Sequence, residues 1–298
     1  MNESTILEEK IIREQLLKNY QGPDRVVHAT ELAGRYAEER KNRPAFSAMT
    51  GLPTIDACLD GFRKGQLVVV SGPPKNGKTL LCQTFTSRFT EQNHKCLWLE
   101  YELSGEEFLM KFPEGKLDFH LPNEMHSKSL DWIEERIIES QEKFGTEIVF
   151  IDHLDFLRDD KKLRNDVSIN LSSYVGGIVQ KVKSMAVQRN IIIFLMSHLR
   201  KNEWTSGKLP SSEELRDSGQ IAQLADTVMM IMRKRNKDNG NLYFENDAIV
   251  GVIENRHTGR TGFVDVQMMD GEFHESTSQY LNKPVPKPIL KKEDQWLN

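Results

Sequence analysis

The sequence predicts an α/β fold: a central, mostly parallel β-sheet covered by helices on both faces, preceded by a helical arm. Two observations lead to this prediction. Apolar runs rich in β-branched residues alternate with longer helical stretches between residues 46 and 275. A glycine-rich segment, residues 72–79, closes the first run and opens the first long helix, as in parallel sheets that bind phosphate groups.

The composition is typical of a soluble globular protein with polar extensions. The 298 residues are 38% hydrophobic and 28% charged, with a net charge of -4. No apolar run approaches the roughly 18 residues of a membrane span, and the first residues do not form a signal peptide. The three cysteines stand alone, so neither disulfides nor a zinc site is expected. The acidic balance argues against wrapping of nucleic acid by overall charge but allows local basic loops.

The chain divides into three regions by composition. Residues 1–45 are charged and predict a helical arm, with helices at 5–19 and 30–41 separated by Gly22-Pro23. Residues 46–275 carry the strand–helix alternation of the α/β domain. Residues 276–298 contain three prolines and several lysines and predict a flexible tail.

The elements of the α/β domain follow from their apolar patterns and breakers. The expected strands lie at 66–71, 95–100, 147–152, 190–197, 227–233, 248–254 and 262–268. The expected helices lie at 78–92, 130–144, 167–189 and 218–224. A hairpin-like turn at 258–262 joins the last two strands.

The segment 72–79 has the G-x-x-x-x-G-K-T pattern of a phosphate-binding loop, between a strand and a helix. Its backbone N–H groups and the helix N-terminus would face the phosphates of ATP. Lys78 would bridge the β- and γ-phosphates, and the hydroxyl of Thr79 would bind Mg²⁺. The residues expected to contact the nucleotide are Gly72, Pro73, Pro74, Lys75, Asn76, Gly77, Lys78, Thr79 and Leu80.

Further polar residues stand at the ends of the expected strands. Asp152 ends a buried strand and would supply the second Mg²⁺ ligand. Many P-loop ATPases place a water-orienting Glu directly after this Asp, but here the position holds His153. The base is therefore expected at another strand end, at Glu100 or Glu102, which the alternation of a strand does not separate. His198 follows a further strand, where a polar side chain can detect the γ-phosphate.

These motifs together resemble the RecA-like ATPase domain of hexameric replicative DNA helicases, the group of bacterial DnaB, the phage primase–helicases and Twinkle. The resemblance covers residues 50–273, and its most discriminating parts are Leu215-Arg216-Asp217-Ser218-Gly219 and the turn Asn255-Arg256-His257-Thr258-Gly259. It implies a RecA-like P-loop core without the family's primase and N-terminal domains. It also implies that Glu102 is the catalytic base and that His198 is the γ-phosphate sensor.

By the same resemblance, Arg256 is an arginine finger that reaches the nucleotide of the neighbouring subunit, and Arg233 lies near the nucleotide base. One position departs from the family pattern, because Glu254 stands where a lysine is common. The finger predicts a homo-oligomer, expected to be a hexamer, in which the arm packs on the adjacent subunit.

The resemblance implies that the loop after His198 grips single-stranded DNA through Arg200, Lys201 and Lys208, with a second basic loop at 158–166. It predicts an ATP-dependent helicase or translocase of DNA replication, with a primase, polymerase or helicase loader as further partners. A cytoplasmic, organellar or viral replication compartment is expected, rather than secretion or a membrane. The alternatives are a RecA/RadA-type recombinase and a KaiC-like nucleotide-binding assembly protein.

Overall fold

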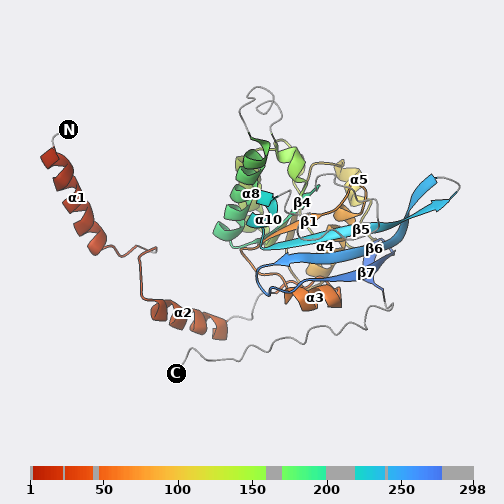
Figure 1. The fold of residues 1–298 in the computed structure, drawn as a ribbon, viewed down its shortest axis with the longest axis horizontal. Helices are drawn as coiled ribbons and strands as arrows, with labels where there is room; N and C mark the ends of the chain where they lie inside the picture. Colours follow the sequence, from red (N-terminus) through yellow and green to blue (C-terminus); the bar gives the residue numbers. More distant parts are fainter. Residues whose placement is uncertain are drawn as a thin grey trace. The chain divides into compact units, whose positions relative to one another are not determined.

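The computed structural model describes residues 3–22, 24–42, 47–158, 170–198, 219–238 and 241–276 (Figure 1). The chain divides into two compact units, Met1–Phe46 and Ser47–Asn298. The first unit contains α1 (Glu3–Lys18) and α2 (Ala29–Asn42). The predicted DNA-binding residues Arg200, Lys201 and Lys208, the motif at 215–218 and the tail beyond 276 lie outside the described residues.

The second unit is built on an eight-stranded sheet in the order β2-β3-β4-β1-β5-β6-β7-β8. Five neighbouring strands, β2 to β5 in this order, run parallel, and the last three pairings are antiparallel. The strands are β1 (Leu67–Ser71), β2 (Cys96–Glu100), β3 (Ile148–Asp152), β4 (Ile192–Ser197), β5 (Thr227–Asp238), β6 (Asn241–Asn255), β7 (Gly262–Met269) and β8 (Glu272–Glu275). The predicted α/β fold with a mostly parallel centre is confirmed.

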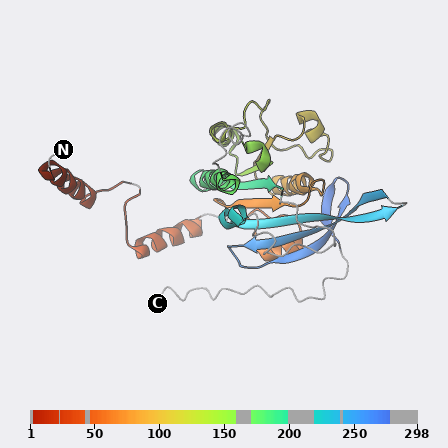
Figure 2. The same ribbon diagram turned by 45° about the horizontal axis from the view of Figure 1, so that its top comes forward.

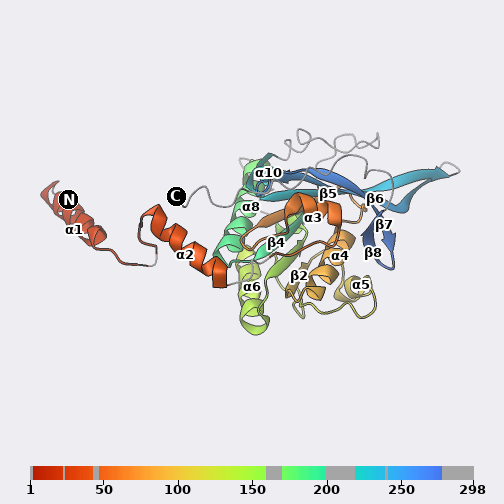
Figure 3. The same cartoon turned by 90° about the horizontal axis from the view of Figure 1, so that it is seen from below.

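Helices cover both faces of the parallel strands. The helices and the 3-10 turn of this unit are α3 (Pro53–Leu59), α4 (Lys78–Glu91), α5 (Gly105–Leu109), α6 (Leu130–Phe144), η1 (Leu154–Leu157), α8 (Leu171–Gln188) and α10 (Gly219–Leu224). Figure 3 shows α6 and α8 on one side of β2 and β4, and α4 on the other. In the described part of the chain, no helix is long and apolar enough to cross a membrane.

Alternation along the strands divides the core into two layers. The aliphatic residues Leu97, Val149 and Ile193 belong to the cluster that packs under α6 and α8. The intervening residues Trp98, Phe150 and Phe194 point to the opposite face and form an aromatic stack, with ring centroids 4.6 and 4.8 Å apart. Phe62 and two rings of α4, Phe85 and Phe89, complete this layer.

Most elements begin and end near the predicted boundaries, and the differences have local causes. β5 and β6 continue beyond the predicted ends at 233 and 248 as a long antiparallel ribbon, seen as the two longest arrows in Figure 2. Residues 234–238 and 245–247 are all charged or polar, so an apolar pattern ends the predicted strands early. α3, α5 and β8 are short elements that the sequence pattern did not predict, because four to seven residues are too few to establish a period.

The aromatic layer predicts a large stability loss on truncation of its central ring. Phe194→Ala removes a fully buried ring in contact with Phe62, Phe85, Phe89 and Phe150. The free energy of unfolding should fall by roughly 3–5 kcal/mol, measured by urea denaturation. The matched control is Val187→Ala on α8, whose side chain is 56% exposed, and which should change stability by less than about 0.5 kcal/mol. Equal effects of the two variants would contradict this layering.

Candidate nucleotide site

The parallel register brings four strand ends to one edge of the sheet. Ser71 at the end of β1 is paired with Ser197 at the end of β4, and Asp152 at the end of β3 is paired with Glu100 at the end of β2. Ligands of open α/β sheets bind at this carboxyl edge. The residues that follow these ends therefore belong to one site, although the sequence separates them by more than a hundred positions.

The loop after β1 requires its glycines. Gly72 has φ 152°, and a Cβ atom there would lie 2.3 Å from the carbonyl oxygen of Ile231. Gly77 has φ 90° and lies against the ring of Phe273. Asn76 holds the loop to β5, because its Oδ1 accepts from the backbone N–H of Arg233 at 3.0 Å. The loop is therefore a rigid cradle that delivers the chain into α4.

Lys78 and Thr79 start α4 and point back into the loop. The ammonium of Lys78 donates to the carbonyl oxygens of Gly72 and Pro73, both at 3.1 Å, and lies 2.9 Å from Nδ1 of His198. Thr79 Oγ1 donates to Asp152 Oδ2 at 2.6 Å. The structure thus brings together four predicted site residues from β1–α4, β3 and β4.

The charged side chains at this edge favour binding of a metal cation together with a polyanion such as a triphosphate. Burial raises the pKa of Asp152 to about 6, opposed by the hydrogen bond from Thr79. Burial lowers the pKa of Lys78, opposed by the carboxylates of Asp152 and Glu102. A hydroxyl and a buried carboxylate in contact are the donors that Mg²⁺ takes, and a buried lysine at a helix N-terminus suits phosphate. The residues therefore fit a nucleoside triphosphate with Mg²⁺.

Glu100 and Glu102 have different surroundings. Glu100 ends β2 and is buried; its Oε1 accepts from the backbone N–H groups of Glu102 and Leu103 at 2.6 and 2.9 Å. Glu102 lies beyond the strand and its side chain is 48% exposed. Glu100 therefore holds the turn after β2, while the exposed carboxylate of Glu102 lies near enough to Lys78 to oppose the burial that lowers the pKa of that ammonium. Alternation did not separate them because β2 ends at Glu100 and the alternation ends with it.

His153 and His198 lie side by side at the site, with ring centroids 4.4 Å apart. Burial lowers the pKa of both imidazoles. The neighbouring His198 lowers the pKa of His153 further, and the Lys78 ammonium lowers that of His198 further. His153, Asp155 and His198 have donor atoms within 4.8 Å of one another, which is a spacing that allows a metal ion. The Lys78 ammonium beside His198 disfavours a cation there.

The two predicted site arginines lie at different edges. Arg233 is beside the loop, and its guanidinium donates twice to the carbonyl oxygen of Glu245, at 2.9 and 2.7 Å. Arg256 follows β6 at the opposite edge, where its backbone N–H donates to the carbonyl oxygen of Asp226. Asp226 in turn is bonded to Leu67, the first residue of β1. The five residues of β1, about 16 Å, therefore separate Arg256 from the glycine-rich loop of the same chain.

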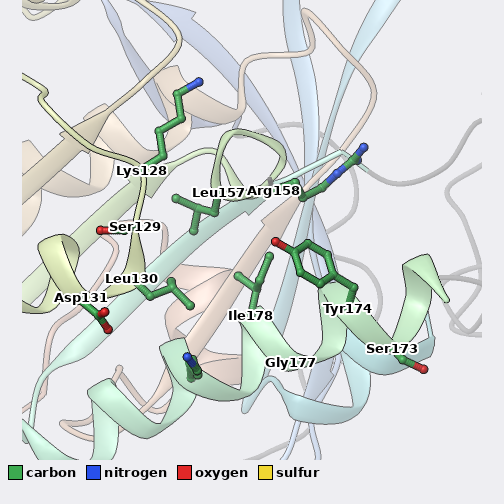
Figure 4. A pocket seen from close by; sticks show the side chains of 11 residues that line it. Lys128, Ser129, Leu130, Asp131, Leu157, Arg158, Ser173, Tyr174, Gly177 and Ile178 are labelled. Atoms are coloured by element: carbon green, nitrogen blue, oxygen red, sulfur yellow. The ribbon is translucent and has the colours of Figure 1, made fainter. Parts of the chain in front are cut away.

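A hollow with a volume of about 720 Å³ lies between the start of α6, the end of η1 and the first half of α8. Figure 4 shows Leu130, Leu157 and Ile178 facing its centre, while Lys128 extends away. Arg158, at the start of the second predicted basic loop, lines the rim and donates to Asp155 at 3.0 Å. The sequence did not indicate this hollow because three separate segments contribute to it.

The chain matches the family model described as "DnaB-like helicase C terminal domain" over residues 116–276, more than half of its length. The replicative DNA helicase DnaB of Mycoplasma pneumoniae is 24% identical over 260 residues, covering 72% of this chain and 53% of the relative. A Chlamydia psittaci protein named "Probable plasmid replicative DNA helicase" is 31% identical, covering 75% and 55%. The chain thus spans about half the length of the curated relatives it matches.

Two solved structures share the fold. An ATPase domain superposes with a TM-score of 0.68 at 18% identity, covering 83% of this chain and 98% of the other. A structure of a DnaB-like replicative helicase and its interactions with primase has a TM-score of 0.64 at 17% identity, covering 90% and 71%. The resemblance inferred from the motifs and the RecA-like fold class are confirmed, and the recombinase and KaiC-like alternatives are not favoured.

Glu100 predicts a distinctive pH dependence of stability. Burial, followed by the nearby Asp152 carboxylate, raises its pKa from 4.5 to about 7. The native protein then binds more protons than the unfolded chain between these values, so the stability from this group is present below pH 4.5 and is lost as pH rises through 7. Glu100→Gln removes the charge, and its amide oxygen can still accept from Glu102 and Leu103.

The variant should match the parent near pH 4.5 and exceed its unfolding free energy by roughly 1–3 kcal/mol above pH 7. Urea denaturation across pH 4.5–8.5 in magnesium-free buffer measures this. Glu107→Gln serves as the control, because hydrogen bonds with Ser104 lower the pKa of Glu107 and its contribution has the opposite sign. A Glu100→Gln protein less stable than the parent at pH 8 would refute the assignment.

Proposed function

We propose that this chain, which belongs to the DnaB-like helicase C-terminal domain family, is an ATP-driven, ring-forming helicase or translocase acting on single-stranded DNA in replication. The observation that carries the proposal is the convergence of Lys78, Thr79, Asp152 and His198 on one loop. Their chemistry suits MgATP, and the family membership supports the proposal that ATP hydrolysis drives movement along DNA.

In this proposal each side chain has a distinct task. Lys78 and the backbone N–H groups of the loop bind the phosphates, and Thr79 with Asp152 holds Mg²⁺, which offsets the charge on the phosphate oxygens. Glu102 orients the attacking water. His198, held 2.9 Å from Lys78, senses the γ-phosphate through its ring. Arg233 lies beside the loop through Asn76, which suits a contact with the nucleotide base.

The position of Arg256 supports an oligomer. About 16 Å of strand separate it from its own loop, so it can complete a site only in a neighbouring subunit. The arm, residues 1–45, would pack on that neighbour. Four large apolar side chains of α1 support this, because they are exposed within the first unit: Ile11, Ile12, Leu16 and Leu17. A hexameric ring is the assembly that we propose.

The contacts with DNA and other proteins are also proposals. Arg200, Lys201 and Lys208 would grip the backbone of one strand, and Arg158, Lys128 and Lys181 line the hollow at the start of the second predicted loop. One solved relative is a DnaB-like replicative helicase described with its interactions with primase. We extend a primase, polymerase or loader contact to this chain on that ground.

Unwinding of a forked DNA duplex tests the proposed function. The protein should separate a fork with single-stranded tails when ATP and Mg²⁺ are present, and DNA should stimulate its ATP hydrolysis. Lys78→Ala should abolish both activities, because the phosphates lose their buried cation, while the fold is retained. A strand-exchange assay run beside it distinguishes a recombinase. Exchange without unwinding, or tight ATP binding without turnover in the presence of DNA, would contradict the proposal.

A further inference from the structure

We propose that His153 is a positioning residue for Glu102. Its Nε2–H group binds the Glu102 carboxylate once that carboxylate moves about 1 Å toward the ring. The inference rests on the proposed ATPase function, in which Glu102 orients the attacking water. It assigns a task to the residue that occupies the place after Asp152, where many P-loop ATPases carry the base itself.

The ring of His153 is fixed by its surroundings. The residue directly follows β3 and is 7% exposed. The ring lies 4.8 Å from the ring of Phe156, tilted by 47°, and 4.4 Å from the ring of His198, at an interplanar angle of 77°. A buried side chain packed against two rings keeps one rotamer, so its nitrogen atoms have constant directions.

The hydrogen bonds of His153 determine which nitrogen carries the proton. Nδ1 accepts from the backbone N–H of Asp155 at 3.2 Å and thereby caps η1. The Asp155 carboxylate is farther from Nδ1, at 3.5 Å, and its other oxygen is bound to Arg158 at 3.0 Å. A neutral imidazole that accepts at Nδ1 carries its hydrogen on Nε2. The ring therefore presents an N–H donor from Nε2.

That donor faces Glu102. Nε2 of His153 lies 3.8 Å from Oε2 of Glu102. The separation is longer than a hydrogen bond, and a shift of about 1 Å by the carboxylate closes it. Glu102 is the partner able to move, since its side chain is 48% exposed and it lies between the end of β2 and α5. His153 is the fixed partner, so the contact orders the carboxylate.

Ordering the Glu102 carboxylate would raise the rate of hydrolysis, because it holds the carboxylate in the reactive position. An exposed glutamate samples several rotamers, and a displacement of about 1 Å at a reacting group costs on the order of 100-fold in rate. A donor from the neighbouring strand end restricts Glu102 to the position from which it can orient water. The chain thus divides between the ends of β2 and β3 a task that many P-loop ATPases assign to the residue directly after the Mg²⁺-binding Asp.

Two variants of His153 separate this role from a structural one. His153→Asn keeps an acceptor for the Asp155 N–H but is too short to reach Glu102. His153→Gln places an N–H near the former Nε2. The Asn variant should lower kcat for ATP about 10- to 100-fold, with the Kd of a fluorescent ATP analogue and the thermal midpoint unchanged. The Gln variant should recover most of the loss. Equal damage by both variants would overturn the proposal.

A double-mutant cycle with Glu102→Ala tests whether His153 acts through Glu102. Once Glu102 is absent, His153→Asn should reduce single-turnover hydrolysis by less than about 2-fold, because the shared interaction is already lost. Independent, multiplicative losses would overturn the inference.

A direct readout does not depend on turnover. In ¹⁵N-histidine-labelled protein, the His153 signals, assigned by their loss in His153→Asn, should report the Nε2–H tautomer. The Nδ1–H tautomer would overturn the assignment. If the parent protein fails to hydrolyse ATP, the proposed function fails, and the tautomer still decides whether His153 can donate from Nε2 to Glu102.

Discussion

The parallel register of β2, β3, β4 and β1 is the constraint on which the site depends. Backbone pairing of Glu100 with Asp152, and of Ser71 with Ser197, aligns the ends of strands far apart in sequence. A slip of one residue in β3 would turn Asp152 away from Thr79 and bring Phe150 out of the aromatic layer. The two core layers, which need opposite faces of the same strands, therefore hold the carboxyl ends of these strands in register.

The same sheet is the reason for our proposal that a second subunit completes the site. The phosphate loop lies at the carboxyl edge of β1, and the turn that carries Arg256 lies at the opposite edge, bonded to Asp226 beside Leu67. Lys183 also binds Asp226, at 2.6 Å, so the turn is anchored to β1 and α8. A rigid connection between the two edges would allow nucleotide contacts at one edge to influence the neighbour at the other. Glu254, one strand residue before Asn255, would add a negative charge to that contact.

The sequence predicted the parts that depend on local patterns. The loop, Asp152 and His198 were identified because each stands at the junction of an apolar run and a polar segment. The choice between Glu100 and Glu102 needed the family resemblance, since it depends on where β2 ends. Nothing in the sequence indicates the contact between His153 and Glu102, because it crosses from one strand end to the next. Short elements such as β8 and α3 were missed, as their few residues are held by tertiary pairing.

Mixing of two inactive variants tests most directly the central claim that each site is completed by a second subunit. Lys78→Ala lacks the phosphate-binding cation but retains Arg256, and Arg256→Ala retains the loop. In randomly mixed rings about one site in four combines an intact loop with an intact arginine. ATPase activity should therefore appear on mixing proteins that are each inactive. Full activity of Arg256→Ala alone, or no recovery in mixed oligomers of normal size, would contradict the account.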